Sequence, residues 1–135
     1  MHPIMRDKAE HLFNFSDKIV DVTLYPDIQE LLTVSDFAIS DYSSCIFDFM
    51  LTRKPVFIYA NDIETYSFDQ GLCYPIESTP FPICKNNYEL FNNILNFNYE
   101  IYLTKVEKFL KEKGCMEDGY ASKRVVDLIE QIMNE

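Results

Sequence analysis

A short polar run in the middle of the chain has the residue types that bind phosphate groups. Asp41, Ser43 and Ser44 lie between an apolar stretch at 37–40 and a segment at 45–50 whose apolar residues have helical spacing. Free backbone N–H groups at the start of a helix, beside two hydroxyls, can hold a phosphate. Asp and Ser are also common helix caps. The residues alone therefore leave two interpretations open, a helix cap and a site for a nucleotide diphosphate.

The segments around this run alternate between expected strands and expected helices. Strands are expected at 18–22, 37–40 and 55–59, and helices at 28–34 and about 43–52. Continuous apolar strands joined by short links predict an α/β fold, with a parallel sheet covered by helices on both faces. Ligands of such sheets bind beyond the carboxyl ends of the strands, where the polar run would lie.

The second half of the chain reads as a loop followed by helices. The loop is expected over 67–87, with at most one short extended piece, because it contains a glycine and three prolines. Helices are expected at 88–95, 98–113 and 121–133, the last of them amphipathic, and Gly114 is expected to end the second. The stretch at 62–66 follows an expected strand, so we expect it to border the same crevice as the polar run.

The composition limits the possible classes of protein. A chain of 135 residues that is 47% hydrophobic is long and apolar enough to form a single folded domain. A net charge of −10 argues against nucleic-acid binding, which needs clustered Lys and Arg. The four cysteines form no CxxC pair, so a zinc site is not expected, and neither another metal nor a cofactor is indicated.

Several separated blocks occur in an order typical of one family of enzymes. The chain resembles the C-terminal part of the CDP-glycerol glycerophosphotransferases, which prime or polymerise the glycerol-phosphate chains of teichoic acids and capsule polymers. The blocks that carry the resemblance are His2-Pro3, Tyr25-Pro26-Asp27-Ile28-Gln29-Glu30-Leu31-Leu32, Ser35-Asp36, Ser40-Asp41-Tyr42-Ser43-Ser44-Cys45-Ile46-Phe47-Asp48-Phe49, Lys54-Pro55-Val56 and Asp118-Gly119-Tyr120-Ala121-Ser122.

The resemblance implies a fold and a set of binding residues. It implies that residues 1–135 form one Rossmann-like, donor-binding domain, the C-terminal half of a larger two-domain GT-B transferase. Ser43 and Ser44 would then contact the donor diphosphate, and Asp48 would face the ribose or the edge of the diphosphate. His2 matches a histidine that approaches the diphosphate in the family. Asp41 is a weaker candidate, expected to order the turn or to hold a backbone N–H, because a carboxylate repels a diphosphate.

The resemblance also implies a donor, an acceptor and a location. The expected donor is CDP-glycerol or a similar CDP-polyol, and the polymer acceptor would bind through an N-terminal domain that this chain lacks. No catalytic residue is expected here, since the family's catalytic base lies in that domain. The full-length enzyme would be cytoplasmic and peripheral to the inner face of the cell membrane. Two alternatives remain: a non-catalytic nucleotide- or partner-binding module, and half of a glycosyltransferase that uses another nucleotide-diphosphate donor.

Overall fold

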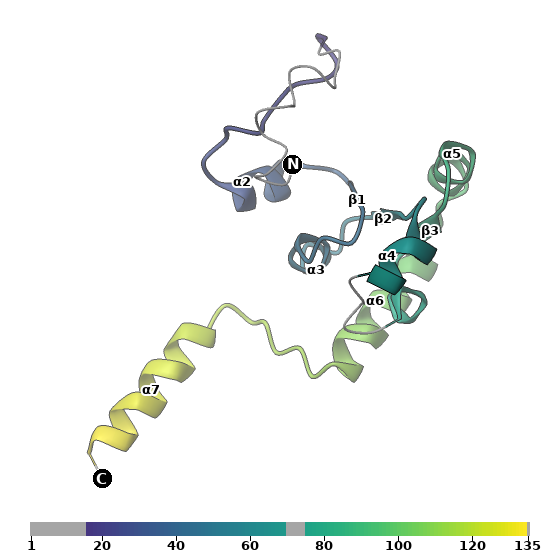
Figure 1. The fold of residues 1–135 in the computed structure, drawn as a ribbon. Helices are drawn as coiled ribbons and strands as arrows, with labels where there is room; N and C mark the ends of the chain where they lie inside the picture. Colours follow the sequence, from purple (N-terminus) through teal and green to yellow (C-terminus); the bar gives the residue numbers. More distant parts are fainter. Residues whose placement is uncertain (1–15, 70–74, 135) are drawn as a thin grey trace. The chain divides into compact units, whose positions relative to one another are not determined.

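A computed structural model describes residues 16–69 and 75–134 (Figure 1). Contacts within the chain divide it into two compact units, Met1–Val34 and Ser35–Glu135. The expectation that the whole chain forms one donor-binding domain stays a prediction.

The described part of the first unit ends in a short helix, α2 (Ile28–Val34). The helix follows the turn at 25–27, as expected from the sequence. The Asp27 carboxylate accepts a hydrogen bond from the Gln29 N–H at 2.8 Å. This bond is the usual way in which an aspartate stabilises the first turn of a helix, because the N–H groups there have no partner within the helix.

The strand expected at 18–22 does not form, so that prediction was wrong. Ser16 and Ile19 instead exchange backbone hydrogen bonds of 3.1 and 3.0 Å, which close a tight turn. Ile19 and Val20 are 54% and 73% exposed. Apolar residues favour a strand only where a neighbouring strand supplies partners for the backbone, and the described sheet lies entirely in the second unit.

The second unit contains a three-stranded parallel sheet. Its strands are β1 (Ala38–Ser40), β2 (Val56–Tyr59) and β3 (Ile83–Cys84), in the order β1-β2-β3. The parallel α/β character and the first two strands confirm the prediction. The third strand lies in the segment expected to be loop with at most one short extended piece; that piece is two residues long, follows prolines and pairs with β2.

Helices connect and follow these strands. They are α3 (Cys45–Met50), α4 (Ile63–Asp69), a single 3₁₀ turn η2 (Ile76–Ser78), α5 (Asn87–Leu95), α6 (Tyr99–Glu112) and α7 (Ala121–Met133). Side-chain caps begin two of them, since Asn86 accepts from the Glu89 N–H and Asn98 from the Ile101 N–H. Gly114 ends α6 with φ +66°, a conformation that glycine adopts without steric cost.

The core of the second unit lies where β2 meets α3 and α6. Val56, Phe57 and Ile58 of β2 are at most 2% exposed, and Phe49 of α3 and Val106 of α6 are fully buried. Helix α3 packs against β1 and β2, and α5 packs against β3 (Figure 1). Because β1 and β2 pair in parallel, their carboxyl ends lie at one edge of the sheet.

Contacts between side chains and backbone fix α6 to the same strands. The Tyr102 hydroxyl donates to the Lys54 carbonyl at 3.0 Å, and the Lys54 ammonium donates to the Ser35 carbonyl at 2.8 Å. The Phe47 ring of α3 stacks on the Phe109 ring of α6 at 6.2 Å between centroids. The loop between β1 and α3 therefore joins two elements that are packed within the second unit.

The C-terminal helix has the amphipathic pattern expected from the sequence. Its apolar side chains are exposed within this chain, at 50% for Ile129 and 63% for Ile132. Over residues 16–69 and 75–134, no helix combines the length and the apolar content that crossing a membrane requires.

Candidate functional site

The polar run identified in the sequence forms the turn between β1 and α3. We call residues 41–44 the serine turn. It starts directly after Ser40, the last residue of β1, and ends directly before Cys45, the first residue of α3. The serine turn thus lies at the carboxyl edge of the parallel sheet, where ligands of this class of fold bind.

Neither serine hydroxyl caps α3. Ser44 already has helical backbone angles, φ −67° and ψ −16°, and its side chain makes no capping hydrogen bond. The Ser43 hydroxyl donates to the Cys45 sulfur at 3.2 Å, which is a weak interaction. Both side chains are exposed. The capping interpretation therefore has no support in the side-chain geometry, and both hydroxyls are accessible to a ligand.

The start of α3 also leaves backbone donors without helical partners. The first hydrogen bonds of the helix run from the Ile46 N–H to the Ser43 carbonyl and from the Phe47 N–H to the Ser44 carbonyl. Among the described residues, the N–H groups of Ser43, Ser44 and Cys45 donate to no carbonyl. Two hydroxyls and up to three N–H groups are therefore close together in sequence, and apart from the weak Ser43–Cys45 bond they are unused by the fold, a donor set suited to an anion.

The two aspartates predicted for the site lie on either side of these donors. Asp41 is exposed, and its carboxylate accepts no hydrogen bond from the part of the chain that the structure describes, so of the two roles expected for it, the bond to a backbone N–H is not formed and the ordering of the turn stays a prediction. Asp48 is also exposed and follows Ser44 by four residues, which places both on one face of the helical segment. His2 lies outside the described residues.

The sequence analysis did not select Tyr42, which makes the most extensive contacts of the serine turn. Its ring stacks on Tyr66 of α4, with 3.8 Å between centroids and 18° between the ring planes. Its hydroxyl donates to Asp62 Oδ1 at 2.7 Å. Burial, followed by the hydrogen bond to Asp62, raises the pKa of Tyr42 far above its ordinary value. The signal in the sequence was the four-residue spacing of Asp62 and Tyr66, which puts both on one helix face.

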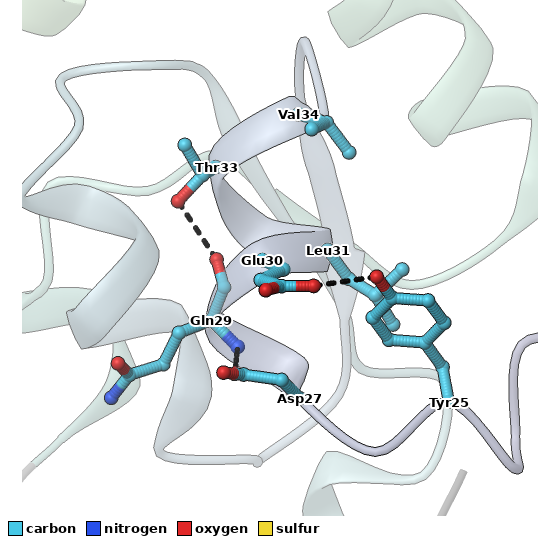
Figure 2. A pocket seen from close by; sticks show the side chains of 7 residues that line it. All are labelled: Tyr25, Asp27, Gln29, Glu30, Leu31, Thr33 and Val34. Carbon is cyan, nitrogen blue, oxygen red and sulfur yellow. Dashed lines mark hydrogen bonds between the residues drawn. The ribbon is translucent and has the colours of Figure 1, made fainter.

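A hollow in the first unit is a second candidate for a binding site (Figure 2). It has a volume of about 590 Å³ and is lined by α2 and the turn before it. Its polar groups are largely committed to one another, since the Tyr25 hydroxyl donates to Glu30 and the Gln29 N–H donates to Asp27. Two carboxylates in its lining oppose a diphosphate, which is an anion. Of the two, the serine turn is therefore the candidate whose groups suit an anion.

The residues of the site do not form a metal centre. Over the part of the chain that the structure describes, no three or more His, Cys, Asp or Glu side chains gather so that they could hold a metal ion. The groups on which binding chemistry can rest are the hydroxyl and N–H donors of the serine turn.

The fold and site define an α/β protein with a parallel sheet and a hydroxyl-rich turn at the carboxyl edge of that sheet. Comparison with known families identifies it further. The model of the CDP-Glycerol:Poly(glycerophosphate) glycerophosphotransferase family matches residues 1–131, and the chain belongs to this family. The resemblance found in the sequence is thereby confirmed.

Individual relatives are enzymes of teichoic acid synthesis. The chain is 33% identical to the teichoic acid ribitol-phosphate primase of Bacillus spizizenii over 98% of this chain and 34% of that enzyme. It is 31% identical to the teichoic acid poly(glycerol phosphate) polymerase of Staphylococcus epidermidis over 100% of this chain and 19% of that enzyme. The chain therefore spans about a third or less of the length of these curated relatives.

The fold also matches a solved structure. A variant of the wall teichoic acid polymerase TagF, soaked with CDPG for 15 minutes, superposes with a TM-score of 0.73 and 30% identity over 97% of this chain and 33% of the polymerase. Membership of this family does not favour the two alternatives, a non-catalytic module or half of a glycosyltransferase.

Proposed function

We propose that this chain is the donor-binding part of a polyol-phosphate transferase of teichoic acid or capsule synthesis. In this proposal the donor is CDP-glycerol or a similar CDP-polyol, and its diphosphate lies over the serine turn. The observation that carries the proposal is that both serine hydroxyls lie exposed at the carboxyl edge of the sheet and cap no helix. The chain that presents them belongs to the glycerophosphotransferase family. The CDPG soak of the related polymerase supports a donor of this kind.

The energetics favour modest affinity. A hydrogen bond to a charged oxygen contributes roughly 1.5–3 kcal/mol, and the dipole of a helix about 0.3–2 kcal/mol. Helix α3 has six residues, so its dipole contribution belongs at the low end. The net charge of −10 and the exposed Asp41 and Asp48 oppose an anion. Within this proposal Asp48 faces the ribose, whose hydroxyls can donate to a carboxylate, and His2 approaches the diphosphate.

The proposal extends to the full-length enzyme of which this chain would form a part. The domain is proposed to be the C-terminal half of a GT-B enzyme, with the acceptor and the catalytic base on a preceding domain. Since the chain spans about a third of a relative such as the ribitol-phosphate primase, this division leaves room for such a domain. The full-length enzyme is proposed to work at the inner face of the cell membrane, where a polymer acceptor would be available.

The direct test is an NMR titration of this chain with four ligands. We expect CDP-glycerol and CDP-ribitol to shift the amide signals of residues 43–45 more strongly, and at lower concentration, than CMP does. UDP-glucose carries the same diphosphate on another base, so it should shift them less than CDP-glycerol does if the nucleobase contributes to binding as the proposal assumes. Equal shifts by all four ligands would indicate a general anion site. No shift at 43–45 with CDP-glycerol would contradict the proposal.

A further inference from the structure

Tyr42 connects the serine turn to α4 at two points. Its hydroxyl donates to Asp62, the residue directly before α4, and its ring stacks on Tyr66, one helical turn later. The Tyr66 N–H in turn donates to the Asp62 carbonyl at 2.9 Å, so these two contacts belong to the same first turn of α4. We call Tyr42, Asp62 and Tyr66 the tyrosine clasp.

The tyrosine clasp connects the serine turn, through side chains, to residues far along the chain. The Ser43 hydroxyl bonds only to Cys45, two residues away, and Asp41 and Ser44 make no side-chain hydrogen bond within the described residues. Tyr42 reaches twenty residues along the chain to Asp62. The position of the turn relative to the next βα connection therefore depends on Tyr42 more than on the residues that would touch a ligand.

Such a connection matters because anion binding depends on the direction of each donor. Hydrogen bonds weaken steeply when the donor angle departs from linear, so hydroxyl and N–H groups must hold their direction to converge on one ligand. Tyr42 precedes Ser43 directly, and its ring is half-buried with its hydroxyl bonded, so its own backbone is restrained. This restraint is transmitted to the backbone of Ser43.

We propose that the tyrosine clasp positions Ser43 and Ser44 for the donor diphosphate, so that Tyr42 and Asp62 are positioning residues of the site. The inference rests on the proposed function, because it assigns the serine turn a diphosphate ligand. It differs from that function in naming residues that touch no ligand and act through the two serines.

The test is a double-mutant cycle on the 135-residue chain, with CDP-glycerol and cytidine as probes and NMR titration as the readout. Tyr42→Phe keeps the stacked ring and removes the hydrogen bond. We expect it to lower the affinity for CDP-glycerol about 5-fold, which is within the range of coupling energies between neighbouring residues. The affinity for cytidine should stay unchanged. In a background of Ser43→Ala with Ser44→Ala, the same change should weaken CDP-glycerol binding less, because only the backbone N–H donors of the turn then remain to be positioned.

Two further variants separate positioning from general stability. Asp62→Asn keeps an acceptor for the Tyr42 hydroxyl, and it should retain more CDP-glycerol affinity than Asp62→Ala. Tyr25→Phe is the matched control, because it also removes a tyrosine-to-carboxylate hydrogen bond, the bond to Glu30 in the first unit. It should change neither ligand's affinity, and the melting temperatures of Tyr42→Phe and Tyr25→Phe should agree within a few degrees.

The outcomes distinguish the clasp from the proposed function. If the serine variant loses CDP-glycerol affinity while Tyr42→Phe does not, the clasp is wrong and the diphosphate site stands. If Tyr42→Phe weakens CDP-glycerol equally with and without the serines, Tyr42 does not act through them, and the positioning role is overturned. If the serine variant binds CDP-glycerol as well as the unmodified chain does, both the site and the clasp fail.

Discussion

The side chains of Ser43 and Ser44 are exposed and make no hydrogen bond that caps the start of α3. Ser44 lies within the helical region of backbone angles, where an N-cap residue would be extended, and its hydroxyl makes no capping bond. A serine in this position adds little to the stability of the helix. Its exposed hydroxyl is free to bond to the ligand that the proposed function places at the carboxyl edge of the sheet.

Replacing both serines with alanine should therefore separate binding from stability. Ser43→Ala with Ser44→Ala should lower the affinity for CDP-glycerol by roughly ten-fold or more, because the hydrogen bonds from both hydroxyls to charged oxygens are lost. Cytidine, which has no diphosphate, should bind as before, and the melting temperature should change little. Calorimetry and thermal unfolding check these expectations. An equal loss for cytidine and CDP-glycerol would assign the serines to the fold alone.

Tyr102 should make stability depend on alkaline pH. Burial raises the pKa of its hydroxyl to about 12, above the ordinary value of 10.0. Below pH 10 the phenol is neutral in both states, and its contribution to stability is fully present. Between pH 10 and 12 the unfolded chain loses the proton first, so stability falls as pH rises, by roughly 1.4 kcal/mol per pH unit.

The comparison with Tyr102→Phe isolates this residue from the lysines and other tyrosines that titrate in the same range. The variant should be less stable near neutral pH by about 1 kcal/mol, because the Lys54 carbonyl loses its donor. Its free energy of unfolding, from denaturant titrations, should fall less steeply between pH 10 and 12. Parallel curves for the two proteins would show that the Tyr102 pKa is not raised by folding.

Helix α3 links the site to the core. One end of it carries the serine turn, while Phe49 and Met50 further along are 0% and 3% exposed. Strand β2, on which α3 packs, is almost wholly buried. The orientation of the hydroxyl and N–H groups of the serine turn therefore depends on apolar packing at the other end of a short helix, since six residues form too few internal bonds to be stable alone.

Removing the Phe49 ring should weaken the packing of α3 against the sheet. Phe49→Ala should destabilise the chain by about 3–5 kcal/mol, the range for a buried aromatic residue replaced by alanine. Phe91→Ala is the control, because Phe91 lies on α5 and is 60% exposed, so little packing is lost. Urea denaturation measures both. Equal destabilisation by the two variants would mean that α3 does not pack against the sheet as described.

At the level of the chain, binding and catalysis are expected to separate. The family's acid–base group is expected on a preceding domain, and proton transfer needs a group within hydrogen-bond reach of the reacting oxygen. The 135-residue chain should therefore bind CDP-glycerol without transferring glycerol phosphate above background. A radiolabelled transfer assay, with a full-length relative as the positive control, measures this. Turnover comparable with that relative would contradict the division of roles.

The sequence by itself determined the family, the parallel α/β class, the first two strands, most helices and the location of the serine turn. These follow from local patterns, namely apolar runs, caps and an ordered set of motifs. The sequence allowed one short extended piece within the loop at 67–87 but did not locate it as a third strand, because two residues after prolines become a strand only when β2 offers partners. The strand expected at 18–22 failed for the converse reason, since an apolar run without a neighbouring strand cannot satisfy its backbone.

The tertiary structure alone decided what surrounds the serine turn. Helical spacing could place Asp62 and Tyr66 on one face, but it could not show that Tyr42, twenty residues before Asp62, would bond to one and stack on the other. That contact exists because β1 and β2 are parallel neighbours, so the connections that follow them emerge at the same edge of the sheet. Motifs specify which groups are available to a ligand, whereas the pairing of strands decides which distant side chains hold those groups in place.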